Sequence, residues 1–249
     1  MSFVGGVGYS NIDLIYSGLD RLPDKGEEIF ARGFSMQFGG GIPATMINLS
    51  RLGVESRIIT FAGHDLFSEF VKKTLNSYPV KTVNLYKGNK MPVVLSSTLL
   101  YCGDRSFISY TDGMDLNDAV MDEVYENLKG AYVVDMHVGF LDVYKRLKKD
   151  GCIQIFDTGW EDDLTLEKYK DYLEIADYYI PNQKEAMKIT GTSSVEEAAD
   201  ILSEFFSDVT IKMDKEGCLL KNKDGIKIIS SVQNVKAIDA TGPGDDFMD

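Results

Sequence analysis

Short apolar runs alternate with amphipathic stretches of helical length along most of the chain. The apolar runs are rich in Val, Ile, Phe and Tyr, and they predict strands over residues 56–62, 131–136, 152–157, 177–180 and 209–213. The amphipathic stretches predict helices over residues 43–52, 66–77, 118–128, 140–149, 165–175, 184–190 and 195–206. This alternation is typical of βα units, so we expect an α/β fold built on a mostly parallel sheet.

Several of the predicted helices have recognisable ends. Ser194, followed three residues later by Glu197, has the pattern of a capping box at a helix start. Gly53 and Gly191 stand where glycine commonly ends a helix. These signals support the boundaries that the hydrophobic pattern predicts.

Two segments, residues 11–36 and about 91–112, show a different pattern, in which apolar and polar residues alternate. Such alternation predicts half-exposed strands rather than strands buried on both faces. We expect the two segments to form a small accessory sheet. Because exposed strand edges favour pairing with another chain, we also expect a homodimer through this sheet.

Composition narrows the classes of partner. The chain is 44% hydrophobic and 26% charged, which fits one large globular domain over residues 1–249. Its formal net charge of −13 argues against general affinity for nucleic acid or for anionic membrane surfaces. The start of the chain lacks a basic n-region, and no apolar run approaches the roughly 20 residues of a membrane span, so we expect a cytoplasmic protein.

The richest candidate chemistry lies in residues 239–247, which read DATGPGDDF. They follow an apolar run and are expected to open a helix. Gly242 and Gly244 would let backbone N–H groups converge at a helix N-terminus, which makes a site for an anion. Asp245 at its mouth is suited to act as a base for a group that attacks the anion. Taken alone, such a loop could equally be a structural turn with capping aspartates.

Residues 239–247 resemble the C-terminal signature of the ribokinase-like (PfkB-type) carbohydrate kinases, commonly written DTTGAGDAF. Four further segments resemble elements of that family in the same order: 8–13 (GYSNID), 38–53 (FGGGIPATMINLSRLG), 181–185 (PNQKE) and 209–217 (VTIKMDKEG). The resemblance spans nearly the whole chain. It implies a three-layer α/β/α sandwich with a small β-sheet lid, and ATP-dependent phosphorylation of a hydroxyl, often a hydroxymethyl group, of a sugar or sugar-like molecule.

The resemblance also implies roles for particular residues. Asp245 would be the catalytic base, with Gly242 and Gly244 in the anion hole. The residues implied for substrate binding are Asn11, Asp13, Gly39, Gly40 and Gly41, to which we add Arg105, from the strand that closes over the sugar, and His137, from the end of a predicted strand. Read without the family, Asp13 could cap a turn, residues 39–41 could be a flexible loop, and His137 could be an ordinary loop residue.

On the nucleotide side, the resemblance implies Mg²⁺ held through water by Glu185 and Asn182, and K⁺ beside Asp239. The residues implied for nucleotide binding are Asn182, Lys212, Asp214, Gly217, Thr241, Gly242 and Gly244. Asn182 and Glu185 could equally form a helix cap, and Lys212 could be a surface lysine at a strand end.

The chain departs from the family pattern at several positions. Ala44 stands where the first signature usually has asparagine, Asp214 where glycine is usual, and Pro243 where a small residue is usual. Pro243 removes one backbone donor from the anion hole. Relatives also continue for several tens of residues past the base, so we expect part of the C-terminal region to be missing and the chain ending at Asp249 to be weak or inactive by itself.

Other classes of protein explain the sequence less well. Residues 6–11 suggest a dinucleotide-binding glycine motif, but its third glycine is Asn11 and no helical pattern follows. There is no GxxxxGK[ST] and no GxSxG, and the chain has only two histidines. A non-catalytic sugar-binding protein on the same fold, motivated by Ala44 and Asp214, and a nucleoside kinase of the same superfamily stay as alternatives.

Overall fold

The computed structural model describes residues 2–102 and 104–232 of the chain. Its centre is a six-stranded sheet in which every neighbouring pair is parallel. From one edge to the other the strands are β10 (Tyr178–Tyr179), β9 (Ile153–Phe156), β8 (Ala131–Met136), β1 (Phe3–Val7), β4 (Ser56–Thr60) and β5 (Lys81–Asn84). All the central strands that the sequence predicted belong to this sheet except the last, at residues 209–213, which belongs to a separate antiparallel sheet described below.

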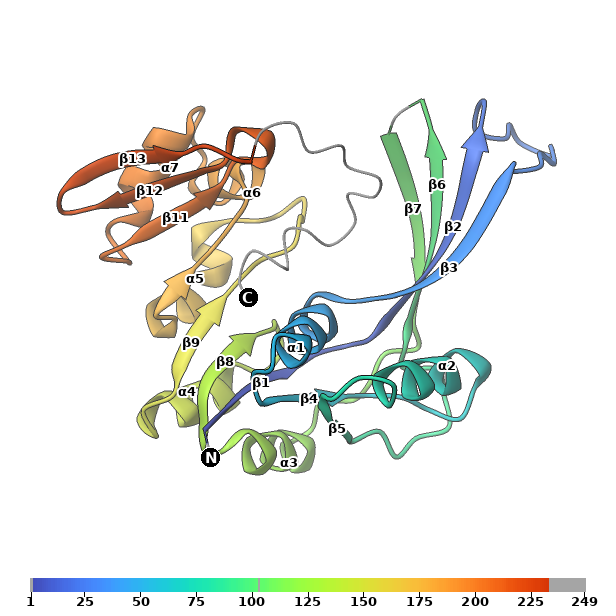
Figure 1. Ribbon diagram of the computed structural model, residues 1–249, viewed down its shortest axis with the longest axis horizontal. Helices are drawn as coiled ribbons and strands as arrows, with labels where there is room; N and C mark the ends of the chain where they lie inside the picture. Colours follow the sequence, from blue (N-terminus) through green and yellow to red (C-terminus); the bar gives the residue numbers. More distant parts are fainter. Residues whose placement is uncertain (1, 103, 233–249) are drawn as a thin grey trace.

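Helices pack on both faces of the central sheet (Figure 1). On one face, α1 (Gly41–Arg51) and α2 (Leu66–Leu75) form a core cluster with the sheet through residues such as Met46, Ile58 and Val71. The remaining helices share a larger cluster, and they are α3 (Asp118–Leu128), α4 (Leu141–Lys149), α5 (Leu166–Ile175), α6 (Gln183–Thr190) and α7 (Val195–Leu202). The three-layer α/β/α sandwich that the sequence predicted is therefore confirmed.

The accessory sheet has four strands in the order β3 (Gly33–Gly39), β2 (Asn11–Leu19), β6 (Val94–Tyr101) and β7 (Asp104–Tyr110). The pairs β2 with β3 and β6 with β7 are antiparallel, whereas β2 and β6 run parallel. Figure 1 shows this sheet, which we call the lid, continuing from the end of β1 and projecting away from the central sheet. All four strands lie within the two segments that the alternating pattern indicated, apart from the end of β3 at Gly39.

A third sheet is formed by β11 (Val209–Lys212), β12 (Cys218–Asn222) and β13 (Gly225–Ile229), all antiparallel. The backbone N–H of Lys212 donates to the Pro181 carbonyl at 2.9 Å, and Asn182 forms a parallel bridge with Lys212. These contacts hold the C-terminal end of β11 beside the C-terminal end of β10. The end of β11 is therefore continuous with the edge of the central sheet where α/β proteins bind their ligands.

The strand order reverses at β1. The chain passes from β1 through the lid to β4 on one side, and it later returns to β8 on the other side of β1. Ligands of open parallel sheets bind where the order reverses, beyond the carboxyl ends of the strands. The residues that follow β1 and β8, beginning with Gly8 and His137, therefore stand at the expected ligand site.

The predicted helix ends are partly correct. Gly191 ends α6 with a φ of 68°, as the glycine signal predicted. Ser194 caps α7 by accepting from the Glu197 N–H, but the Glu197 carboxylate accepts from the Ser193 N–H and does not complete the box. Within the described residues, no helix combines the length and apolar character that crossing a membrane requires.

Candidate active site

Asn11 and Asp13 lie at the start of β2, just beyond the end of β1. They are two residues apart on one strand, so their side chains share a face of the lid. The Asn11 side-chain amide donates to Asp13 Oδ1 at 2.9 Å. This contact orients the half-buried carboxylate and leaves its second oxygen, Oδ2, available to accept hydroxyl hydrogen bonds.

A line of hydroxyl groups extends this pair across the lid. Ser96 Oγ on β6 lies 3.3 Å from the Asn11 side-chain oxygen and 2.8 Å from Ser109 Oγ on β7. The strand register places Ser96 beside Asp13 and Ser109 beside Ser96. Ser96 and Ser109 are not predictable from the sequence, because an isolated serine in an alternating strand carries no motif and only the strand register brings it to Asn11.

The environment of Asp13 makes it a weaker acid than usual. Burial raises the pKa of its carboxyl group, and the hydrogen bond from Asn11 and the charge of Arg105 oppose the rise. Arg105 lies on β7 with the same alternation as Ser109, so it belongs to the face of the lid that carries Asp13. Its guanidinium stands 5.6 Å from the centre of the Phe107 ring. The structure thus brings Arg105 and Asp13 to one face of the lid.

The glycines at residues 39–41 let the backbone approach this carboxylate. A Cβ on Gly39 would lie 2.9 Å from Asp13 Oδ2, and one on Gly40 would lie 2.8 Å from the Tyr9 carbonyl oxygen. Gly40 also has a φ of 107°, which favours glycine, and it precedes Gly41, the first residue of α1. The N-terminus of α1 therefore opens directly beside Asp13.

His137 follows β8 at the point where the strand order reverses. Its ring lies 6.0 Å from that of Tyr9 and 6.5 Å from that of Phe140, centre to centre. Burial lowers the pKa of His137, and this favours the neutral imidazole at pH 7. The His137 backbone N–H donates to the hydroxyl of the fully buried Tyr144 at 2.8 Å. Tyr144 thereby anchors the loop that presents His137, and a tyrosine in an amphipathic helix gave no sign of this in the sequence.

On the nucleotide side, Asn182 and Glu185 begin α6. The Asn182 side chain accepts from the N–H groups of Lys184 and Glu185, and the Glu185 carboxylate accepts from the Asn182 N–H at 2.9 Å. This is a complete capping box with Glu185 buried. The helix-cap alternative is therefore correct as a description of geometry, and it holds both side chains at the carboxyl edge of the sheet.

Lys212 is not a surface lysine. Its side chain is 11% exposed and its ammonium group lies 2.8 Å from Asp157 Oδ2, whose side chain is 18% exposed. Asp157 directly follows β9, so the pair reaches across the end of β10. Asp157 is not predictable from the sequence, because 55 residues separate it from Lys212.

Asp214 and Gly217 form the turn after β11, which includes the short 3₁₀ helix η1 (Asp214–Glu216). Asp214 has a φ of 54°, a conformation that glycine adopts more readily. This explains why glycine is usual there. Gly217 has a φ of 99°, and a Cβ there would lie 1.9 Å from the Ile229 carbonyl oxygen, so packing against the end of β13 already requires glycine.

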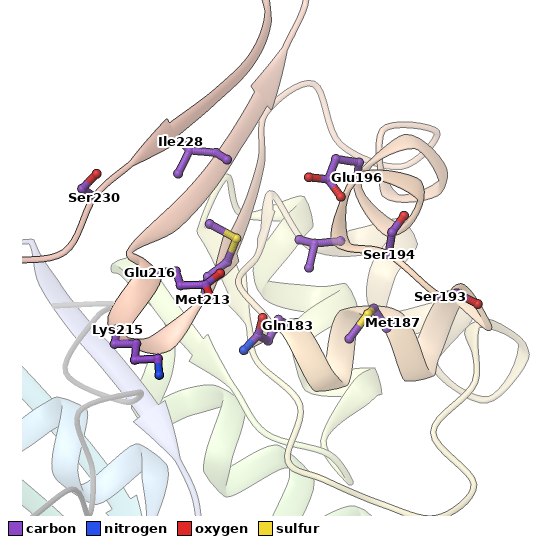
Figure 2. A pocket seen from close by; sticks show the side chains of 11 residues that line it. Gln183, Met187, Ser193, Ser194, Glu196, Met213, Lys215, Glu216, Ile228 and Ser230 are labelled. Atoms are coloured by element: carbon purple, nitrogen blue, oxygen red, sulfur yellow. The ribbon is translucent and has the colours of Figure 1, made fainter.

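A cavity of about 620 Å³ adjoins this turn. Figure 2 shows its lining side chains, which come from α6, the start of α7, η1 and β13. Gln183 on one wall directly follows Asn182, and Met213 and Lys215 on the opposite wall flank Asp214. The cavity therefore borders the predicted nucleotide residues and not the lid.

The donors on this side fit a magnesium ion held mainly through water. In the part of the chain that the structure describes, no three His, Cys, Asp or Glu side chains cluster as direct metal ligands. Mg²⁺ in kinases commonly binds one or two carboxylates, several waters and the substrate phosphates. Glu185 supplies a carboxylate of this kind.

The other predicted residues of the site lie outside the described residues. They are Asp239, Thr241, Gly242, Gly244 and Asp245. The described residues form two groups at the carboxyl edge of the sheet: the lid group with His137, and the group around Asn182 and Lys212.

Comparison with known proteins decides the family. The sequence model of the pfkB family carbohydrate kinases matches residues 1–248. The chain belongs to this family. This PfkB kinase is therefore a phosphotransferase that acts on an alcohol group, and ATP is its co-substrate.

The relatives of this PfkB kinase are distant but cover most of it. A Pyrococcus horikoshii protein provisionally named a sugar kinase is 28% identical over 228 residues, which are 84% of this chain and 70% of the relative. Ribokinase of Lactococcus lactis is 22% identical, with 99% of this chain and 81% of the relative covered. The structure of Arabidopsis thaliana ribokinase complexed with ribose and ATP has a TM-score of 0.80 at 21% identity, covering 100% of this chain and 84% of that one. The shared fold is ribokinase-like.

Proposed function

We propose that this chain acts as a single kinase domain that transfers the terminal phosphoryl group of ATP to a hydroxymethyl group of a sugar or sugar-like molecule. The observation that carries the proposal is the Asp13 carboxylate, which lies where the strand order reverses. It accepts a hydrogen bond from Asn11, and Gly39 packs directly against it. A carboxylate oriented in this way can accept hydrogen bonds from two neighbouring hydroxyls, which is the recognition that a sugar ring offers.

The remaining lid residues would complete the sugar site. Arg105 lies on the face of the lid that carries Asp13. The His137 ring lies 6.0 Å from the ring of Tyr9, between β1 and β2. Nδ1 of His137 lies 2.8 Å from the Val138 carbonyl oxygen, so Nδ1 donates there and Nε2 of the neutral ring can accept a hydrogen bond from a substrate hydroxyl. The backbone of Gly40 and Gly41, at the start of α1, would contribute N–H donors to the same sugar.

In-line transfer would then depend on Asp245, which would accept the proton of the attacking hydroxyl. The backbone N–H groups of Gly242 and Gly244 would stabilise charge on the transferring group, and Asn182, Lys212, Asp214, Gly217 and Thr241 would contact the nucleotide. Glu185, with Asn182, would hold Mg²⁺ through water; when bound, the ion neutralises charge on the phosphate oxygens. A K⁺ ion beside Asp239 belongs to the same proposal.

The proposal is tested by measuring ATP-dependent phosphorylation across pentoses, hexoses, amino-sugar adducts and nucleosides. The same panel is run with the Asp245→Asn variant. We expect one sugar to be turned over and its kcat to fall by several orders of magnitude in the variant, because the variant cannot accept the proton. Omission of Mg²⁺, or replacement of K⁺ by a bulky organic cation, tests the two ions separately.

Two other outcomes would redirect the proposal. Turnover of nucleosides in preference to sugars would assign the chain to the nucleoside kinases. Tight sugar binding without turnover, unchanged by Asp245→Asn, would instead indicate a sugar-binding protein on a kinase fold.

A homodimer through the lid is also part of the proposal. On the face of the lid opposite Asp13, the strand register gathers apolar side chains that are largely exposed: Phe34 (62%), Met36 (40%), Ile108 (70%) and Tyr110 (58%). A second lid could cover such a surface. A monomer mass that is independent of concentration in sedimentation equilibrium would exclude the dimer, and a dimer that Ile108→Lys dissociates would support it.

A further inference from the structure

The ion pair between Lys212 and Asp157 is the feature of the nucleotide side that the family resemblance does not account for. The two groups are 2.8 Å apart and nearly buried, and they stand at the carboxyl ends of β11 and β9 with the end of β10 between them. Lys212 is held at its backbone as well, because its N–H donates to the Pro181 carbonyl directly before Asn182. The ammonium group is therefore restrained at both ends of its side chain.

Stability alone is a poor explanation for this pair. The free energy needed to remove two charges from water is about as large as the free energy gained from their attraction. Apolar side chains of similar volume therefore often stabilise a protein equally well or better. The surroundings are also negative: Glu185 is buried at the start of α6, and Asp214 follows Lys212 by two residues. Asp157 and Glu185 both act on Tyr179: burial raises the pKa of its hydroxyl, and the charges of these two carboxylates raise it further. Lys212 is thus a nearly buried cation paired with one of these carboxylates.

We propose that Asp157 is the positioning residue that holds the Lys212 ammonium group at the carboxyl edge of the sheet, where Lys212 meets the phosphates of the nucleotide. The inference rests on the proposed function, since it supplies a receptor for the ATP that the kinase uses. A polyphosphate brought to this edge meets the α6 N-terminus and carboxylates that would repel it. A restrained ammonium group offsets that repulsion, and lysine binds phosphate as a compact charge.

The Lys212 ammonium group can hold Asp157 and a ligand together. Its nitrogen lies 2.8 Å from Asp157 Oδ2, and the two side chains are 11% and 18% exposed. A lysine has three N–H donors, so a phosphate oxygen can bind Lys212 without displacing Asp157. Asp157 would therefore act on the nucleotide only through Lys212.

The test is a double-mutant cycle on the binding of a non-hydrolysable ATP analogue with Mg²⁺, measured by isothermal titration calorimetry on the whole chain. We expect Lys212→Met to weaken binding roughly 10- to 100-fold, the loss typical of a hydrogen bond to a charged group. Asp157→Asn should weaken it roughly five-fold or more, and in the Lys212→Met background it should add less than about two-fold. Asp157→Glu, which can still reach the ammonium group, should restore most of the affinity.

Asp177→Asn is the matched control. Asp177 forms an ion pair of 2.6 Å with Lys148 directly before β10, at the opposite end of the strand, so its loss should leave nucleotide affinity unchanged. Thermal denaturation of every variant separates affinity from stability. The double variant leaves neither member of the pair as an unpaired charge, so if Lys212→Met alone unfolds, the double variant still reports the nucleotide affinity of a chain without Lys212.

Three results would overturn the inference. Asp157→Asn could lower only the melting temperature and leave nucleotide affinity intact, in which case the pair is structural. The two single effects could add fully, in which case Asp157 does not act through Lys212. If the unaltered chain binds no nucleotide at all, both the proposed function and this inference are wrong. That outcome is recognisable because the unaltered chain and every variant then give the same result.

Discussion

Gly39 offers a direct test of whether Asp13 binds the substrate. Gly39 lies in β3 without a left-handed φ, so alanine fits its backbone, but the new Cβ would stand 2.9 Å from Asp13 Oδ2. Gly39→Ala therefore displaces the carboxylate by steric contact alone. The carboxylate must turn away, and its 2.9 Å hydrogen bond from Asn11 is strained or lost.

The expected rise in KM for the sugar follows from the displacement of the Asp13 carboxylate. A displaced carboxylate loses at least one hydrogen bond to a substrate hydroxyl, which contributes about 1.5–3 kcal/mol when one partner is charged. That corresponds to a rise in KM for the sugar of roughly 10- to 150-fold, with a smaller effect on KM for ATP. The free energy of unfolding should fall by no more than about 1–2 kcal/mol, because the gain of about 0.5–1 kcal/mol from replacing glycine in a strand offsets part of the strained hydrogen bond from Asn11.

The assay is steady-state kinetics with the best sugar of the panel, beside urea unfolding of the same samples. Gly159→Ala is the matched control, since Gly159 also lacks a left-handed φ and a Cβ there would meet no atom within 4 Å. A KM for the sugar that stays within about two-fold of the unaltered chain in Gly39→Ala would refute the assignment of Asp13 to the substrate.

Three further predictions concern the effects of Tyr144, Asp214 and His137 on stability. Tyr144→Phe removes the acceptor of the buried His137 N–H and should lower the free energy of unfolding by about 1–3 kcal/mol in urea titration. Asp214→Gly relieves a φ of 54° and should raise that free energy by about 0.5–1 kcal/mol, whereas Asp214→Ala should not raise it. Burial lowers the pKa of His137, so the unfolded chain binds the proton more tightly than the folded chain. Protonation of His137 therefore lowers the free energy of unfolding as the pH falls below about 6.5. The stability of the unaltered chain relative to His137→Gln should fall between pH 7.5 and 5.5, and a constant difference would contradict this.

Much of the fold was predictable because its signals are local. Predicted helices 43–52, 118–128 and 165–175 match α1, α3 and α5 closely, since each has an apolar stripe and a clear end. The lid segments were recognisable from the alternation of polar and apolar residues. What the sequence did not indicate was the parallel pairing of β2 with β6, because register between distant strands depends on the whole sheet.

The site was predictable where a motif marks it and not elsewhere. Asn11, Asp13, Asn182 and Glu185 stand in recognisable short patterns, and the structure gives each a defined set of hydrogen bonds. Asp157, Ser96 and Ser109 do not. Their partners lie 55, 85 and 13 residues away along the chain, and only the packed sheets bring them together.

The parallel pairing of β2 with β6 also bears on how the protein folds. The two halves of the lid come from residues 11–39 and 94–110, and the segment between them supplies the helices α1 and α2 and the strands β4 and β5 of the central sheet. Contacts between residues so far apart in sequence form slowly, because a long loop must close first. The lid should therefore join only after the first half of the central sheet has folded, so the part of the site around Asp13 would be among the last parts to form. Until then the apolar strands of both halves are exposed, which makes this stage the one at which a newly made chain is most prone to aggregate.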